Sequence, residues 1–150
     1  ATKPVYIKMP INLSIEEFDK LLKIAVKYKI NGVVIGNLTK VKDPNLIKDE
    51  IPPHVKGGIS GKPTEMLCNE LISYTYKNYG KQLIIIGVGG IFSAEDAYEK
   101  IKRGATLLQL ITGMIFMGPQ LIGEINHGLA ELLKKDGHSN ISEAVGSYYR

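Results

Sequence analysis

Short apolar runs alternate with longer amphipathic stretches along most of the chain, and this alternation constrains the fold more than any other feature. The apolar runs have the length of β-strands and lie at residues 5–9, 32–37, 83–88 and 106–113. Each is followed by a stretch with apolar residues at helical spacing, at residues 14–29, 64–79, 93–103 and 119–135. This order predicts four parallel βα units in one α/β domain, with no linker to a second domain.

Composition and charge narrow the classes of protein. With 150 residues and 44% hydrophobic side chains, the chain can bury a core of its own. The net charge of +4 comes from scattered lysines, with Arg103 and Arg150 as the only arginines, so a nucleic-acid partner is not expected. No apolar run reaches the roughly 18 residues of a membrane-spanning helix. The first residue, Ala1, suggests a piece cut from a longer protein.

Cysteine and histidine give no sign of redox or metal chemistry. Cys68 is the only cysteine and lies within a predicted helix, so we expect a structural thiol and no internal disulfide. His54, His127 and His138 lie in a loop, a helix and the tail, without the spacing of metal ligands. The sequence therefore predicts no metal site.

The third strand passes into its helix through a glycine-rich turn. Gly89 and Gly90 directly precede a helix that Ser93 is placed to cap, and backbone N–H groups in such a turn can close on an anion. The spacing is not the GxGxxG of dinucleotide-binding folds, because Phe92 occupies the last glycine position. A tight structural turn explains the glycine pair as well as a phosphate site does.

The fourth strand ends in a second turn of small residues, Ile111, Thr112 and Gly113. Consecutive final βα loops form the phosphate site of many (β/α)8 barrels, so we predict that the amides of both turns converge on one phosphate pocket. A barrel needs eight units and about 250 residues. This chain has four predicted units.

Five segments resemble, in order, the C-terminal half of dihydroorotate dehydrogenase. They read VYIKMPINLS, INGVVIGNLT, GGISGKP, IIIGVGGIFSAEDAYEKIKRGATLLQL and TGMIFMGPQLIGEI. The tail GLAELLKKDGHSNISEAVG is similar to the ending of the membrane-associated, quinone-reducing class. The resemblance implies that residues 1–150 form the C-terminal half of a (β/α)8 TIM barrel, with four βα units and a tail.

The resemblance also implies a function. Members of this family use flavin mononucleotide (FMN) to oxidise dihydroorotate to orotate in de novo pyrimidine (UMP) biosynthesis, and this class passes the electrons to quinone at the bacterial or mitochondrial inner membrane. The family's catalytic serine lies in the N-terminal half, so no catalytic residue is assigned here and the fragment alone should be inactive. Its expected partners are the other half of the barrel or a second copy of itself.

Family contacts carry over to individual positions. The resemblance implies FMN contacts from Lys8, Gly36, Gly61, Gly89, Gly90, Ile111, Thr112 and Gly113, and substrate contacts from Asn37 and Leu38. A lysine at a strand end can also simply extend its ammonium into solvent, and an asparagine often closes a strand as a turn residue. The matches favour a functional role for Lys8 and Asn37.

Three positions depart from the family pattern. Threonine is usual on both sides of the substrate asparagine, whereas Gly36 and Leu38 flank Asn37, so one flavin contact and one substrate hydroxyl are absent. Ile111 replaces a usual tyrosine, but a backbone amide contact survives that exchange. FMN binding is therefore the firmer inference. Two alternatives stay open, another FMN-dependent (β/α)8 oxidoreductase and a non-catalytic phosphate-binding half-barrel module.

Overall fold

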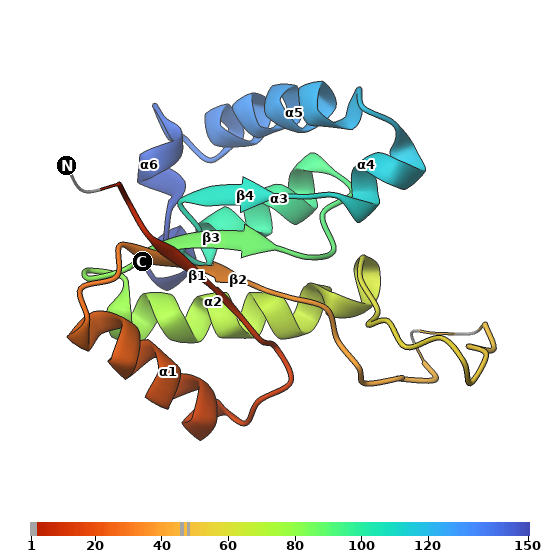
Figure 1. Cartoon of the computed structure of the whole chain (residues 1–150). Coiled ribbons are helices and arrows are strands. Elements are labelled where there is room, and N and C mark those ends of the chain that lie inside the picture. The colour runs from red at the N-terminus through yellow and green to blue at the C-terminus, as the bar shows by residue number, and fades with distance from the viewer. Residues whose placement is uncertain (1–2, 46, 48) are drawn as a thin grey trace.

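A computed structural model, which describes residues 3–45, 47 and 49–150, shows a four-stranded parallel sheet (Figure 1). The strands pair in the order β1-β2-β3-β4, so neighbours in sequence are neighbours in the sheet. Their bounds are β1 Tyr6–Met9, β2 Gly32–Ile35, β3 Ile84–Val88 and β4 Leu107–Gln109. The prediction of parallel βα units is confirmed.

A helix follows every strand, and two of the helices begin with the predicted caps. The longer helices are α1 Ile15–Lys27, α2 Glu65–Tyr79, α3 Ala94–Lys102 and α5 Leu121–Lys135. Ser14 and Glu17 form a reciprocal capping box at α1, and the Ser93 hydroxyl accepts a hydrogen bond from the Asp96 amide at α3. Short helices lie at η1 Lys62–Thr64, α4 Thr112–Met117, α6 Ile141–Ala144 and η2 Ser147–Tyr149.

The prediction was wrong at two boundaries. The fourth strand ends at Gln109, and the predicted strand end at residues 111–113 forms the start of α4 instead. Pro119 lies just before α5 rather than in its first turn. The predicted end of the second helix at residue 79 is correct, and Gly80 is the C-cap of α2 with a right-handed φ of −62°.

One face of the sheet is covered by α1 and α2. Alternate strand residues point to the same face, and Met9, Val33, Ile35 and Ile85 point into this core. The helices contribute side chains that are nearly or fully buried, namely Phe18, Leu22 and Ala25 from α1 and Cys68, Leu71 and Ile72 from α2. The apolar periodicity of the two helices is therefore used for packing against the strands.

The other face carries a different row of side chains. Lys8, Val34, Ile86 and Leu107 are register partners across the four strands. Leu107 is 54% exposed in this row, and Ile84, on the same face, is 40% exposed. Within the described residues, β1 and β4 each pair on one side only, so the sheet has two open edges.

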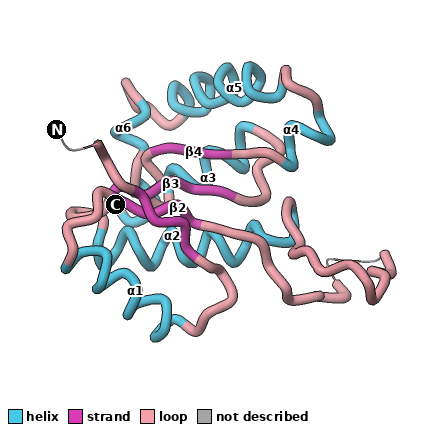
Figure 2. The backbone as a smooth tube through the Cα atoms, in the orientation of Figure 1, coloured by secondary structure: helices cyan, strands magenta, loops and turns pink. Residues whose placement is uncertain are grey.

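A long segment between β2 and α2 extends away from the sheet and helices (Figure 2). Its base is closed by an antiparallel bridge in which Thr39 and Ile59 exchange backbone hydrogen bonds of 2.9 and 2.7 Å. The Asn12 amide donates to the Thr39 hydroxyl at 2.8 Å, which ties the loop after β1 to the same point. No helix in the described part of the chain is long and apolar enough to cross a membrane.

Candidate functional site

The residues predicted to contact cofactor and substrate line one pocket at the C-terminal edge of the sheet. The lining consists of Lys8, Gly36, Asn37, Leu38, Ser60, Gly61, Thr64, Val88, Gly89, Gly90, Ile91, Leu110, Ile111, Thr112 and Gly113. Because parallel strands bring their carboxyl ends to one edge, residues distant in sequence meet there. Every predicted site residue is among the lining residues, which places the candidate site where the four strands end.

The loops after β3 and β4 are in direct contact at this pocket. A Cβ atom added to Gly113 would collide with the carbonyl oxygen of Ile91, so the two turns pack backbone to backbone. The predicted approach of the two glycine-bearing turns is therefore present in the structure. Neither the Gly90 nor the Thr112 backbone N–H donates a hydrogen bond to another described residue. Both amides are thus available to a ligand.

The segment before α2 closes the third side of the pocket. The Thr112 hydroxyl donates to the Ser60 hydroxyl at 2.9 Å. A Cβ atom on Gly61 would lie 3.0 Å from the Thr112 methyl carbon, so this glycine is also in close contact with the turn after β4. Sequence reasoning missed Ser60 because an isolated serine in a loop carries no spacing signal.

The conformation of the turn after β3 requires glycine. Gly89 and Gly90 have φ values of 97° and 73°, which side chains rarely adopt. An added Cβ at Gly89 would lie 2.6 Å from the Thr64 hydroxyl oxygen, and one at Gly90 would collide with the Cβ of Glu65. The sequence allowed two reasons for this glycine pair, close approach of a ligand and a tight structural turn. The structure adds a further reason, the packing of this turn on the start of α2.

The amides at the start of α3 are largely used by the helix itself. The Asp96 carboxylate accepts a hydrogen bond from the Phe92 amide at 2.9 Å, and the Asp96 amide donates to the Ser93 hydroxyl at 3.2 Å. The carboxylate also faces the positive end of the helix dipole. An anion in the pocket would therefore depend on Gly90 and Thr112 more than on the first turn of α3.

Lys8 and Asn37 are two polar residues that line the pocket and are exposed. Lys8 takes part in none of the ion pairs formed between described residues. Leu38 is 47% exposed beside them. A free ammonium and a free carboxamide can together hold an anionic, hydrogen-bonding ligand.

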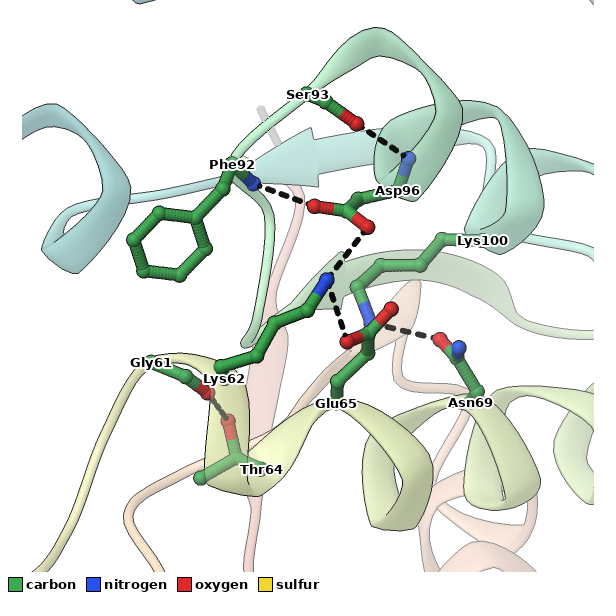
Figure 3. A network of polar contacts seen from close by, with 9 residues as sticks. All are labelled: Gly61, Lys62, Thr64, Glu65, Asn69, Phe92, Ser93, Asp96 and Lys100. Carbon is green, nitrogen blue, oxygen red and sulfur yellow. Dashed lines mark hydrogen bonds and ion pairs between the residues drawn. The ribbon is translucent and has the colours of Figure 1, made fainter. Parts of the chain in front are cut away.

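A group of charged and polar residues beside the pocket joins α2 to α3, and we call it the polar latch (Figure 3). The Lys62 ammonium lies 2.7 Å from an oxygen of Glu65 and 2.7 Å from an oxygen of Asp96. Partial burial acts against the charge on Lys62, but the hydrogen bonds that the ammonium donates to Asp96 and Glu65 outweigh it and raise its pKa. The three side chains therefore form a stable charged triad.

The latch continues inward through a fully buried lysine. The Lys100 ammonium donates to the Asn69 amide oxygen at 2.7 Å, and burial lowers the pKa of Lys100. The neighbouring Cys68 thiol is also buried, which raises its pKa. The latch therefore consists of the Lys62, Glu65 and Asp96 ion pairs and, behind them, the hydrogen bond between Lys100 and Asn69.

The sequence alone did not identify Lys62, Asn69, Asp96 or Lys100 as a group. These residues come from different elements and have no characteristic spacing, so the fold alone brings them together. Within the described residues, no group of three or more metal-ligating side chains is present.

Comparisons with known proteins give a consistent family. The sequence profile of the family described as dihydroorotate dehydrogenase matches residues 1–133. The chain is 43% identical over 155 residues to the dihydroorotate dehydrogenase (quinone) of Crocosphaera subtropica, covering 97% of this chain and 40% of that protein. It is 44% identical to the protein of the same name from Nautilia profundicola, covering 96% of this chain and 39% of the relative.

Solved structures with a similar fold carry the same family name. The crystal structure of ligand-free DHODH from Eimeria tenella superposes with a TM-score of 0.91 at 28% identity, covering 99% of this chain and 41% of the other. The structure of the Eimeria tenella enzyme in complex with ferulenol gives the same TM-score. The chain spans about two fifths of the length of the relatives it matches.

Proposed function

The chain belongs to the dihydroorotate dehydrogenase family, and we propose that it forms the C-terminal four βα units of an FMN-dependent barrel that oxidises dihydroorotate to orotate and reduces quinone. The observation that carries this proposal is the convergence of all the predicted cofactor and substrate positions on one pocket. The quinone acceptor is supported by the names of the relatives.

The pocket has the donors that FMN requires. The phosphate would be held by the Gly90 and Thr112 amides and the Thr112 hydroxyl, at a turn where the backbone can approach an anion closely. Ile111, which is exposed at this turn, can contribute the same backbone contact that a tyrosine would. Bound FMN would supply the redox chemistry of the reaction. The residues present therefore fit the cofactor.

Lys8 and Asn37 would act on the reacting end of the ligands. A fixed ammonium beside the flavin ring stabilises negative charge that develops there during reduction. The Asn37 carboxamide offers both a donor and an acceptor to the polar edge of orotate. Lys8 lies in β1 and Asn37 lies two residues after the end of the adjacent strand β2, and both line the pocket.

The structure gives a physical reason for one departure from the family pattern. A Cβ atom at Gly36 would collide with the Ile11 side chain and lie 2.9 Å from the Cys68 sulfur, so a threonine does not fit there. The lost hydroxyl at this position reflects the packing of β2 against Ile11. Leu38 has no such constraint, since it is 47% exposed at the pocket.

The catalytic base and the quinone site belong to the rest of the barrel in this proposal. We propose that four further βα units close the sheet and that the complete protein acts at the membrane periphery, where quinone is dissolved. The two open sheet edges are the sites at which those units would pair.

The complete protein, meaning these units with those that close the barrel, provides the test. We expect it to be purified with bound FMN and to oxidise dihydroorotate with a soluble quinone, and more slowly with fumarate or NAD. Turnover with fumarate or NAD but not with quinone would favour another acceptor class. A flavin-loaded protein that leaves dihydroorotate unchanged would support a different FMN barrel, and a protein without flavin would support a non-catalytic module.

A further inference from the structure

We infer that the polar latch, and Lys62 with Asp96 in particular, positions two walls of the pocket and thereby sets the affinity for the flavin phosphate. This inference rests on the proposed FMN site. It assigns a role to residues that touch the pocket's glycine turns without lining the phosphate position themselves.

Lys62 is placed in the chain so that it can affect the pocket. It directly follows Gly61, which lines the pocket and contacts Thr112. Gly61 is the residue before the η1 turn and has a φ of 78°, a conformation that side chains rarely adopt. An ion pair that fixes Lys62 therefore fixes the backbone of Gly61 as well.

Asp96 forms two contacts at once. One carboxylate oxygen accepts from the Lys62 ammonium at 2.7 Å, and the other accepts from the Phe92 amide at 2.9 Å (Figure 3). Phe92 lies two residues after Gly90, in the turn whose amide faces the pocket. One carboxylate thus joins the segment containing Gly61 to the turn containing Gly90.

Glu65, Asn69 and Lys100 support this contact from positions that are partly or fully buried. Glu65 packs against the backbone of Gly90 and pairs with Lys62 at 2.7 Å. Below them, Lys100 is fully buried and bonds Asn69 on the next turn of α2. The Glu65 and Asp96 side chains are only 21% and 15% exposed, so water screens their pairing with Lys62 only in part. The latch therefore holds α2 and α3 at a fixed separation on either side of the turn.

The Asp96→Asn variant distinguishes the two roles of Asp96, the ion pair with Lys62 and the hydrogen bond from the Phe92 amide. The amide oxygen of asparagine can still accept from Phe92, while its NH2 group would face the Lys62 ammonium and cannot accept from it. Lys62→Met removes the ammonium but keeps a similar aliphatic stem, and Lys62→Arg restores a cation that can reach the carboxylates.

The experiment measures FMN affinity of the complete protein after flavin removal, by quenching of flavin fluorescence. We expect Asp96→Asn and Lys62→Met each to weaken FMN binding by about tenfold or more, as displaced supporting residues do at preorganised sites. The double variant should lose no more FMN affinity than the single variant with the larger loss, because the two residues act as one contact. Lys62→Arg should recover most of the affinity.

Matched controls lie on the same helix, away from the pocket. Glu99→Gln removes a carboxylate that pairs with Arg103 at 2.7 Å, and Lys102→Met removes a lysine paired with Glu99 at 3.6 Å. These variants should bind FMN like the wild type. Melting temperatures without flavin are recorded for all variants, and the latch variants should melt within the range of the controls.

The outcomes separate the two proposals. Wild-type protein that does not bind FMN overturns the proposed function, and the latch inference with it. Wild-type protein that binds FMN, with latch variants that bind within about twofold of it, overturns the inference alone. Loss of affinity that follows loss of melting temperature equally in latch and control variants also overturns it, since the effect would then be general destabilisation.

Discussion

At the scale of single residues, Lys8 offers the most direct test of the flavin site. In the complete protein, Lys8→Ala should raise the barrier to flavin reduction by dihydroorotate by about 2 to 4 kcal/mol, because it removes a fixed charge beside the reduced ring. Lys8 is exposed and unpaired among the described residues, so the free energy of unfolding should change by about 0.5 kcal/mol or less. Stopped-flow absorbance measures the reduction rate.

Lys81→Ala serves as the control, because Lys81 is an exposed lysine in the turn between α2 and β3. Its reduction rate should equal that of the wild type. Unchanged reduction in flavin-loaded Lys8→Ala would reject the role given to Lys8.

Gly90 and Gly137 form a matched pair for separating backbone strain from packing. Both have a positive φ, 73° and 76°, but an added Cβ would collide with Glu65 at Gly90 and would meet nothing within 4 Å at Gly137. Gly137→Ala should lower the free energy of unfolding by about 1 to 2 kcal/mol from the left-handed backbone alone. Gly90→Ala should cost more, because Glu65 must also move. Equal losses in urea denaturation would show that packing on α2 is unimportant.

At the scale of elements, α1 and α2 are joined by hydrogen bonds to one carboxylate. Tyr74 and Tyr79 donate to the same Asp19 oxygen at 2.8 and 2.6 Å, and Lys23 pairs with the other at 2.7 Å. The hydrogen bond with Lys23, followed by that with Tyr79, lowers the pKa of Asp19 from 3.8 to about 2. Burial, followed by the bond to Asp19, raises the pKa of Tyr79 from 10.0 to about 12.

These shifts predict a pH window for the contact. The folded pKa of Asp19 is depressed, so its stabilisation is present above pH 3.8 and is lost as the pH falls to about 2. The folded pKa of Tyr79 is raised, so its stabilisation is present below pH 10.0 and is lost as the pH rises through about 12. Asp19→Asn should therefore destabilise the protein at pH 6 and have a smaller effect near pH 2.

Urea denaturation between pH 2 and pH 6 checks this prediction. Glu70→Gln, an exposed position on α2, is the control and should follow the wild type at every pH. A difference between wild type and Asp19→Asn that stays constant across this range would contradict the assignment.

The elements also show what sequence can and cannot predict. The strands and long helices were predicted because burial of Val33, Ile35 and Phe18 enforces a regular apolar period. The end of β4 was misplaced because the apolar run continues into α4, whose Ile115 and Phe116 are 71% and 77% exposed. Prediction from hydrophobicity assumes that apolar residues are buried, and these exposed apolar residues do not follow that rule within this chain.

The candidate site divides in the same way. Lys8 lies near the end of β1, and Gly36 and Gly89 directly follow β2 and β3, so topology and the family pattern were sufficient to bring them to one pocket. The polar latch was missed because Lys62 and Asp96 lie in separate βα units, and only the contact of α2 with α3 makes them partners.

At the scale of the whole molecule, the open sheet predicts self-association. The 150 residues alone should form dimers or larger assemblies, because β1 and β4 leave two edges unpaired and Ile84 and Leu107 are exposed on the face that a closed barrel would bury. They should not oxidise dihydroorotate, because this chain carries no assigned base. Light scattering at tens of micromolar and a dihydroorotate assay measure both properties.

Closing the barrel provides the control for this prediction. The complete protein should bury the same edges and faces, so any association it shows should not depend on Ile84 or Leu107. A stable monomer of the 150 residues would show that the open edges are protected by some other means, and measurable turnover would reveal a base within this chain.

The Thr39–Ile59 bridge has a consequence for engineering. Because the segment is closed at its base by paired hydrogen bonds and by Asn12, changes in its outer part need not be transmitted to Asn37 or Gly61. Each doubling of a flexible loop's length costs only about 0.6 kcal/mol of closure entropy. The outer part of this loop is thus the natural place to splice in an affinity tag or a fluorescent reporter while the pocket stays intact.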